Sequence, residues 1–111
     1  MRVSIEGKVI HGKKRGRILG YPTINLKIKE HLVAQGVYRG LVQIGDRQYK
    51  AAIFKGVEHH LIEAYILGFS GDLYGQAVKI IVEDKIREVK QFKRMEDLKD
   101  QIAQDIRNLF L

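Results

Sequence analysis

Residues 36–54 read GVYRGLVQIGDRQYKAAIF, two runs rich in β-branched and aromatic residues on either side of a Gly-Asp turn. Val, Ile, Tyr and Phe favour strands, and a short polar segment with glycine between two such runs is typical of a β-hairpin. We therefore predict strands at 36–44 and 49–54, joined by a turn at 45–48.

Further strand-like segments lie on both sides of this hairpin. They cover residues 3–11, 26–32 (a short strand and a turn), 61–69 and 76–82. Residues 12–25 contain three glycines and the only proline of the chain, which predicts an extended loop. Six short strands separated by turn residues are typical of a small antiparallel barrel.

The pattern changes after Arg94, where apolar residues recur at intervals of three and four: Met95, Leu98, Ile102, Ile106 and Leu109. This spacing predicts an amphipathic helix of about four turns, which we expect to pack on the sheet. The predicted fold class is mainly β, an antiparallel six-stranded barrel with a C-terminal α-helix. At 111 residues, the whole range 1–111 is expected to form a single domain.

Charge and composition narrow the function classes. A formal net charge of +7 indicates attraction to anions such as nucleotides, nucleic acid or acidic lipid. The chain has no cysteine, which excludes disulfides and thiolate metal sites. No apolar run approaches the roughly 20 residues that span a bilayer, so no membrane association is expected. Glu6 comes too early for a signal peptide, and a cytoplasmic protein is expected.

Residues 16–26, GRILGYPTINL, have the composition of a phosphate-binding loop. Glycine lets a backbone approach a ligand closely, and the proline restricts the path into Thr23. Thr23 and Asn25 offer two hard-oxygen ligands suited to a magnesium ion that also holds phosphates. The Walker sequence is absent, so this would be a phosphate loop of another kind.

Glu63 lies within an otherwise apolar strand, on the same face as Leu61 and Tyr65. One possibility is a partly buried position at the barrel rim, where desolvation raises the pKa of a carboxylate and lets it accept a proton from an alcohol. The other is an exposed position on an outward face. The spacing leaves both open.

Lys13, Lys14 and Arg15, together with Arg17, form a basic run close to Tyr21. Positive charge beside an aromatic residue can bind single-stranded nucleic acid. The aromatic residues do not cluster on one strand, however, and this favours a loop that assists a small anionic ligand. The spacing of the four histidines does not support a metal site.

Taken in order, several segments closely resemble riboflavin kinases, either alone or fused to an adenylyltransferase in FAD synthetases. They are His11-Gly12, residues 16–26, GVYRG at 36–40, Glu63, GDLYG at 71–75, Ile86-Arg87 and Phe92. The resemblance spans essentially the whole chain. It implies a six-stranded Greek-key barrel with a terminal helix that transfers the γ-phosphate of ATP to the 5′-hydroxyl of riboflavin, giving FMN.

The resemblance also implies roles for individual residues. Glu63 matches the catalytic carboxylate that activates the hydroxyl. Thr23 and Asn25 match the positions that hold Mg²⁺, or alternatively Zn²⁺ or Mn²⁺. The nucleotide positions are Gly12, Arg17, Gly20, Thr23, Asn25, Ile66, Gly68 and Tyr74, and the flavin positions are Arg87, Lys90 and Phe92. The implied partners are the small molecules ATP and riboflavin, bound by a monomer.

Three departures from the family pattern leave other functions open. Residues 52–62 are shorter than usual, Gly68 replaces a frequent acidic residue or histidine, and Val89 replaces a frequent glutamate. These departures allow a degenerate barrel that binds flavin or nucleotide without turnover. A nucleic-acid-binding barrel rests only on the net charge and the basic run, and no nucleic-acid partner is expected.

Overall fold

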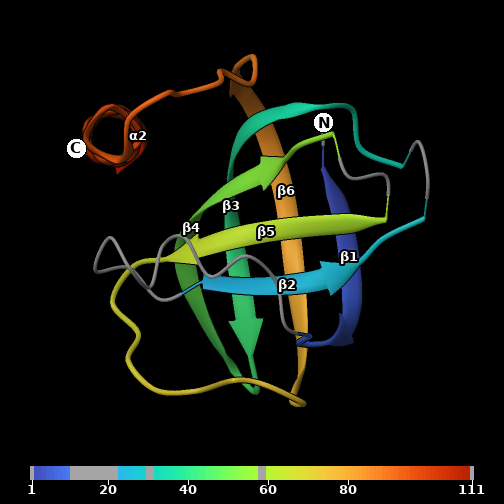
Figure 1. Ribbon diagram of the computed structural model, residues 1–111. Helices are drawn as coiled ribbons and strands as arrows, with labels where there is room; N and C mark the ends of the chain where they lie inside the picture. Colours follow the sequence, from blue (N-terminus) through green and yellow to red (C-terminus); the bar gives the residue numbers. More distant parts are fainter. Residues whose placement is uncertain (1, 11–22, 30–31, 58–59, 111) are drawn as a thin grey trace.

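Six strands and one helix make up the part of the chain that the computed structural model describes, which is residues 2–10, 23–29, 32–57 and 60–110 (Figure 1). The elements are β1 (Val3–Lys8), β2 (Thr23–Lys27), β3 (Gly36–Ile44), β4 (Arg47–Lys55), β5 (Leu61–Ile66), β6 (Ala77–Arg87) and α2 (Met95–Phe110). The predicted hairpin is confirmed as β3 and β4, and the predicted helix as α2.

The strands form one antiparallel sheet in the order β1-β6-β3-β4-β5-β2. Strands β3, β4 and β5 follow one another as neighbours, and β6 returns beside β3, which is the strand order of a Greek key. The two edge strands approach each other at a bridge between Ile10 and Asn25, where the Ile10 amide donates to the Asn25 carbonyl at 2.9 Å. The sheet is therefore a nearly closed barrel, as predicted.

Alternation along the strands separates two hydrophobic clusters. Residues that point inward, such as Leu26, Ile53 and Ile62, fill the barrel and are at most 1% exposed. A second cluster on the outer surface joins Ala52 and Tyr65 to Ile102 of α2. The helix thus covers the outer face of β4 and β5, which confirms that it packs on the sheet.

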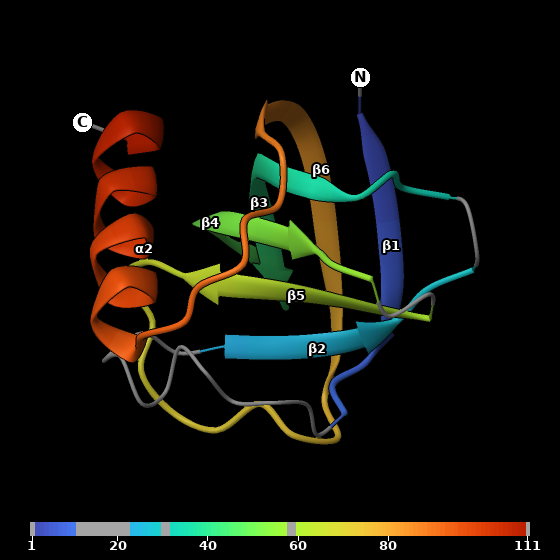
Figure 2. The same ribbon diagram turned by 45° about the horizontal axis from the view of Figure 1, so that its top comes forward.

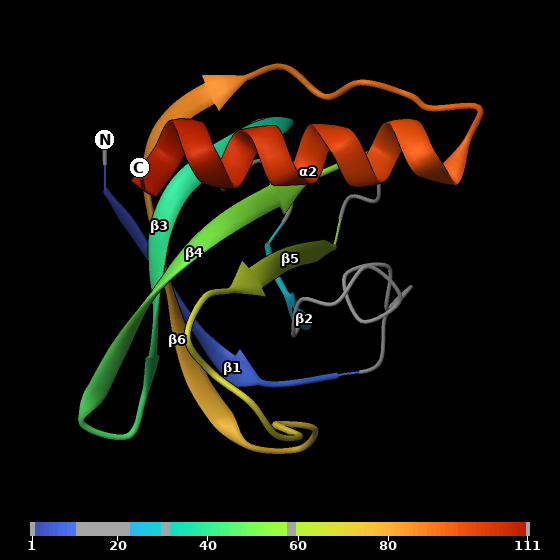
Figure 3. The same cartoon turned by 90° about the vertical axis from the view of Figure 1, so that its left-hand side faces the viewer.

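A segment of irregular chain connects β6 to α2. We call residues 88–94 the strap. Figures 2 and 3 show the strap leaving the end of β6 and α2 turning back alongside it in the opposite direction. The turn is supported by a hydrogen bond from the Leu98 amide to the Arg94 carbonyl at 3.3 Å. Strap and helix together stand beside the outer face of the barrel.

Several predicted boundaries were wrong: β1 ends at Lys8 and β5 at Ile66, before the predicted residues 11 and 69, and β4 begins at Arg47, before residue 49. The predicted loop at 12–25 ends earlier, because β2 already begins at Thr23 and pairs with β5 along its length. Within β2, Ile24 and Leu26 are buried in the barrel, so the alternation of the strand outweighs the loop signal of the preceding residues. The predicted strand at 76–82 is longer, because β6 continues to Arg87 across an irregularity in its pairing with β3.

Gly40 gives a stability prediction, since β3 approaches β6 closely at this residue. A Cβ on Gly40 would lie 2.2 Å from the Ile81 carbonyl oxygen and 2.2 Å from Cδ1 of Ile53. The carbonyl belongs to the backbone of the adjacent strand and cannot move without disturbing the sheet. We expect Gly40→Ala to lower the free energy of unfolding by about 3 kcal/mol or more, as measured by urea denaturation.

Gly7→Ala on β1 is the matched control for this prediction. A Cβ on Gly7 would meet only the Leu26 side chain, at an ordinary 3.8 Å. The free energy of unfolding should therefore change by less than about 0.5 kcal/mol. Equal stability of the Gly40→Ala variant and the wild type would contradict the close approach of β3 to β6.

Candidate functional site

A cavity of about 790 Å³ lies between the outer face of the barrel, the strap and α2. Its barrel side is formed by residues of β2, β3, β4, β5 and the end of β6. The other walls come from the strap and from Leu98, Ile102 and Asp105 of the helix. The cavity therefore combines residues of five barrel strands with the strap and the C-terminal helix.

One transverse row of residues crosses the barrel side of the cavity. Cross-strand partners in an antiparallel sheet point to the same face, and the register links each strand to the next. The row runs through Asn25, Glu63, Phe54, Val37 and Arg87, and all five line the cavity. The strand pairing thus places an amide and a carboxylate at one end and a guanidinium at the other.

Glu63 points away from the barrel interior and into this cavity. Its neighbours Ile62 and Ala64 are 1% and 0% exposed inside the barrel, so alternation directs Glu63 outward. The Glu63 side chain is half-buried and lies between Asn25 on β2 and Phe54 on β4. Glu63 therefore combines parts of the two positions considered above, because it lies on the outward face and is nevertheless partly buried.

Thr23 and Asn25 share one face of β2, because they are two residues apart on a strand. Asn25 is 5% exposed and lines the cavity opposite Glu63. Thr23 is opposite Tyr65 and is half-buried. Hydroxyl and amide oxygens suit a hard cation such as Mg²⁺, which accepts one or two protein ligands and completes its shell with phosphate and water.

The described residues contain no cluster of three or more His, Cys, Asp or Glu side chains that could hold a metal ion. A dedicated protein cage for a cation is therefore not found in this part of the chain. The pair on β2 fits a cation that arrives with a phosphate ligand better than one held by the protein alone.

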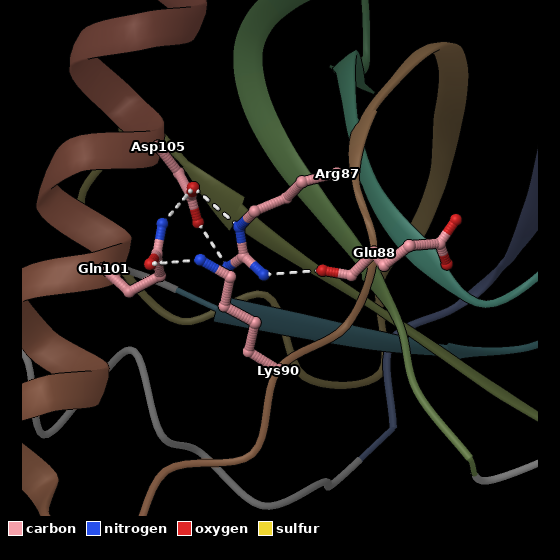
Figure 4. Close-up of polar contacts among 5 residues, drawn as sticks. All are labelled: Arg87, Glu88, Lys90, Gln101 and Asp105. Carbon is pink, nitrogen blue, oxygen red and sulfur yellow. Dashed lines mark hydrogen bonds and ion pairs between the residues drawn. The ribbon is translucent and has the colours of Figure 1, made fainter.

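At the other end of the row, Arg87 is held by Asp105 of α2 (Figure 4). Arg87 Nε donates to Asp105 Oδ1 at 2.9 Å, and Arg87 Nη2 donates to Asp105 Oδ2 at 2.8 Å. The remaining nitrogen, Nη1, donates to the Glu88 carbonyl at 2.8 Å. Such a bidentate pair fixes the plane of the guanidinium as well as its position.

The strap supplies Val89, Lys90 and Phe92 to the cavity wall, together with Lys93 and Arg94. Val89, at the position where the family often has glutamate, therefore lines the cavity. The lining contains more cationic than anionic side chains. The cations are Arg87, Lys90, Lys93 and Arg94, and the carboxylates are Glu63 and Asp105. Arg87 is paired with Asp105 and Arg94 with Glu96, so the excess positive charge on the strap side comes from Lys90 and Lys93.

The start of the strap is also tied to β6. Lys85 donates a hydrogen bond to the Glu88 carboxylate, and this interaction raises the pKa of Lys85 above its usual value. The Glu88 side chain is thus engaged with β6 while its backbone carbonyl accepts from Arg87.

Other residues predicted for the site lie elsewhere. Ile66 is 1% exposed in the barrel core, Gly68 is exposed just after β5, and Tyr74 is 54% exposed in the connection between β5 and β6. None of the three lines the cavity. Gly12, Arg17 and Gly20 lie outside the described residues, as do the basic run and Tyr21.

Sequence reasoning missed the contribution of the helix. Asp105 and Gln101 were not singled out, although Asp105 follows Ile102 by three residues and is on the buried side of α2, only 4% exposed. An acidic residue at a position where the pattern favours an apolar one is the signal that could have identified it. Phe54 and Tyr65 were likewise missed, because both look like ordinary strand residues.

Comparison with known proteins shows the family to which the chain belongs. The sequence model of the flavokinase family, described as riboflavin kinase, matches residues 1–110. The chain belongs to the riboflavin kinase family. It is 35% identical over 113 residues to the bifunctional riboflavin kinase/FMN adenylyltransferase of Buchnera aphidicola from Acyrthosiphon pisum, covering 93% of this chain and 36% of that protein.

Two solved structures share the fold. Riboflavin kinase from Trypanosoma brucei has a TM-score of 0.71 and 27% identity, covering 97% of this chain and 74% of the other. A Streptococcus pneumoniae protein described as a macrolide-efflux protein has a TM-score of 0.79 and 30% identity, covering 96% of this chain and 36% of the other.

The chain spans about a third of the length of the curated relatives that it matches first, among them the Buchnera protein. In this riboflavin kinase relative, a second activity, FMN adenylyltransferase, is part of the name of the longer protein. No helix in the described part of the chain is long and apolar enough to cross a membrane.

Proposed function

We propose that this chain is a riboflavin kinase that transfers the γ-phosphate of ATP to the 5′-hydroxyl of riboflavin and produces FMN and ADP. One observation carries the proposal: Glu63 and Asn25 are cross-strand partners at one end of a cavity whose other end is formed by Arg87 and the strap. A proton acceptor beside a cation ligand is the arrangement that phosphoryl transfer to an alcohol requires.

The extent of the row suits a long, two-part substrate. Glu63 and Arg87 are three strand spacings apart across β5, β4, β3 and β6, which corresponds to roughly 14 Å along the sheet. Riboflavin carries its reacting hydroxyl at the end of a flexible chain, far from its planar ring system. In the proposed orientation the hydroxyl lies near Glu63 and the ring lies toward the strap.

Glu63 would act as the general base. The 5′-hydroxyl oxygen attacks the γ-phosphorus, its proton passes to a Glu63 carboxylate oxygen, and the bond from the γ-phosphorus to the bridging oxygen breaks to release ADP. Phe54 is the cross-strand partner of Glu63 and would shield one side of the carboxylate from water. Partial burial strengthens the interaction of this carboxylate with a nearby hydroxyl.

Thr23 and Asn25 would hold the divalent cation together with the nucleotide phosphates. When bound, a divalent cation neutralises the charge that develops on the phosphate oxygens. We propose Mg²⁺, with Zn²⁺ or Mn²⁺ as alternatives, because both side chains present neutral oxygens on one face of β2. Asn25 would orient the phosphates toward the hydroxyl that Glu63 activates.

The flavin ring would bind between the barrel face and the strap. Val37 and Phe54 on the barrel and Val89 and Phe92 on the strap provide apolar surface around the same cavity. A planar aromatic ring system gains from burial against such surfaces and from stacking. The nucleotide roles of Gly12, Arg17, Gly20, Ile66, Gly68 and Tyr74 remain part of this proposal, as do a monomeric state and a cytoplasmic location.

Incubation of the purified chain with riboflavin, ATP and Mg²⁺ tests the function. We expect FMN and ADP in equal amounts, detected by chromatography, and no FMN when the divalent cation is removed with EDTA. Parallel reactions with Zn²⁺ and Mn²⁺ identify the preferred metal. Riboflavin binding without FMN formation under every metal would contradict the proposal and indicate a flavin-binding module.

A further inference from the structure

The strap and α2 are joined by a ladder of polar contacts that lies beside the proposed flavin end of the cavity (Figure 4). The two segments run in opposite directions, so the contacts form a series from the end of β6 to the turn before α2. Along this series, the paired residues lie closer and closer together in the sequence. Arg87 contacts Asp105, Lys90 Nζ donates to Gln101 Oε1 at 3.4 Å, and the Leu98 amide donates to the Arg94 carbonyl.

Asp105 and Gln101 join this ladder into one network. Gln101 Nε2 donates to Asp105 Oδ1 at 3.0 Å, while Gln101 Oε1 accepts from Lys90. Asp105 Oδ1 therefore accepts from both Gln101 and Arg87. Two residues one helical turn apart thus hold both cationic side chains that the family resemblance places at the flavin.

Burial distinguishes this ion pair from the others in the described part of the chain. The Arg87 and Asp105 side chains are 17% and 6% exposed, whereas the next most buried pair, Lys79 and Glu6, is 35% and 73% exposed. A buried ion pair often stabilises a protein no more than well-packed apolar residues of the same size would. We therefore expect its main effect here to be on position, because it fixes where the guanidinium and the attached backbone lie.

We propose that Asp105, supported by Gln101, is a positioning residue that sets the flavin affinity of the cavity. It holds Arg87 and the strap in place, and through them the slot between Val89 and Phe92 on the strap and Val37 and Phe54 on the barrel. The inference rests on the proposed function, since it assigns the flavin to this end of the cavity. It goes beyond that function by making the affinity for flavin depend on a residue of α2.

Asp105→Asn is the first test, because it keeps the size of the side chain but removes its charge and one of its two acceptor oxygens. We expect the Kd and KM for riboflavin to rise about tenfold or more. The KM for ATP and the kcat at saturating riboflavin should stay within about twofold of wild type. Flavin fluorescence reports the Kd, and steady-state FMN formation reports the kinetic constants.

Asp105→Glu and Asp100→Asn are the matched variants. Glutamate retains a bidentate carboxylate, so Asp105→Glu should recover most of the riboflavin affinity. Asp100 is exposed on the same helix, and Asp100→Asn should behave as wild type. Unchanged riboflavin binding in a folded Asp105→Asn protein would overturn the inference, as would an equal loss of ATP and riboflavin binding or a lack of recovery in Asp105→Glu.

Limited trypsin digestion gives a readout that needs no ligand. The strap contains the cleavage sites Lys90, Lys93 and Arg94, and we expect several-fold faster cleavage there in Asp105→Asn, with cleavage at Lys50 of β4 unchanged. If Asp105→Asn does not fold, Gln101→Met removes the link to Lys90, retains the ion pair and should change both readouts in the same direction.

The outcomes separate the two proposals. Equal strap cleavage in variant and wild type overturns the inference, whether or not FMN is made. A wild-type chain that binds riboflavin but makes no FMN overturns only the proposed function, because the effect of Asp105→Asn on riboflavin binding can still be measured. A wild-type chain that does not bind riboflavin at all overturns both.

Discussion

Glu63→Gln is expected to lower kcat for FMN formation by about 10²–10⁴-fold, because glutamine keeps the size of the side chain but cannot accept the hydroxyl proton. Glu63 lies beside Asn25 and Phe54 in the transverse row, and glutamine can still fill this position and form hydrogen bonds there. Riboflavin and ADP should therefore bind with nearly wild-type Kd values, measured by flavin fluorescence and by calorimetry.

Glu6→Gln is the matched control for this change. Glu6 is an exposed strand carboxylate on β1 that pairs with Lys79, and it does not line the cavity. The kcat of this variant should equal that of the wild type. A fully active Glu63→Gln enzyme would contradict the role of Glu63 as the base, and a loss of both binding and turnover would point to a structural role instead.

Asn25→Leu is expected to lower kcat/KM for ATP by about 100-fold or more, because it removes an oxygen ligand from the proposed cation and phosphate position. Leucine has the same branched shape as asparagine and is larger, but residue 25 borders the cavity and not the packed barrel interior, so the barrel should still form. Circular dichroism checks the fold, and FMN formation at increasing Mg²⁺ concentration measures the effect on the metal.

Asn25→Asp and Asn108→Leu complete this experiment. Aspartate restores an oxygen ligand with added charge, so Asn25→Asp should retain more activity than Asn25→Leu and should saturate at a lower Mg²⁺ concentration. Asn108 is exposed on α2, and Asn108→Leu should leave the kinetics unchanged. Equal Mg²⁺ dependence in the wild type and both Asn25 variants would exclude Asn25 from the metal position.

Local patterns in the sequence were sufficient for much of the fold. The hairpin of β3 and β4 follows from β-forming residues around a glycine-containing turn, and α2 follows from its three- and four-residue apolar spacing. Alternation also placed Glu63 on the face opposite to Ile62 and Ala64, but only the structure shows that Ile62 and Ala64 are the buried residues and that Glu63 lies on the outer face. These features depend on neighbours in the chain.

Features that depend on distant segments were not predictable in the same way. The acidic and basic residues from Glu83 to Lys85 resemble the end of a strand, yet β6 continues because β3 offers a partner beyond the irregularity. Asp105 reaches Arg87 because α2 runs back alongside the strap in the opposite direction. The spacing of residues within the helix does not predict this return. Likewise, the start of β2 is fixed by its pairing with β5.

Asn25 has one role through its backbone and another through its side chain. Its backbone carbonyl accepts the hydrogen bond at which β1 and β2 meet, and its side chain lines the cavity. A ligand that binds the Asn25 side chain would therefore also hold the backbone of Asn25 in its folded position and so favour the bridge between Ile10 and Asn25. By mass action, filling the site makes the barrel harder to open.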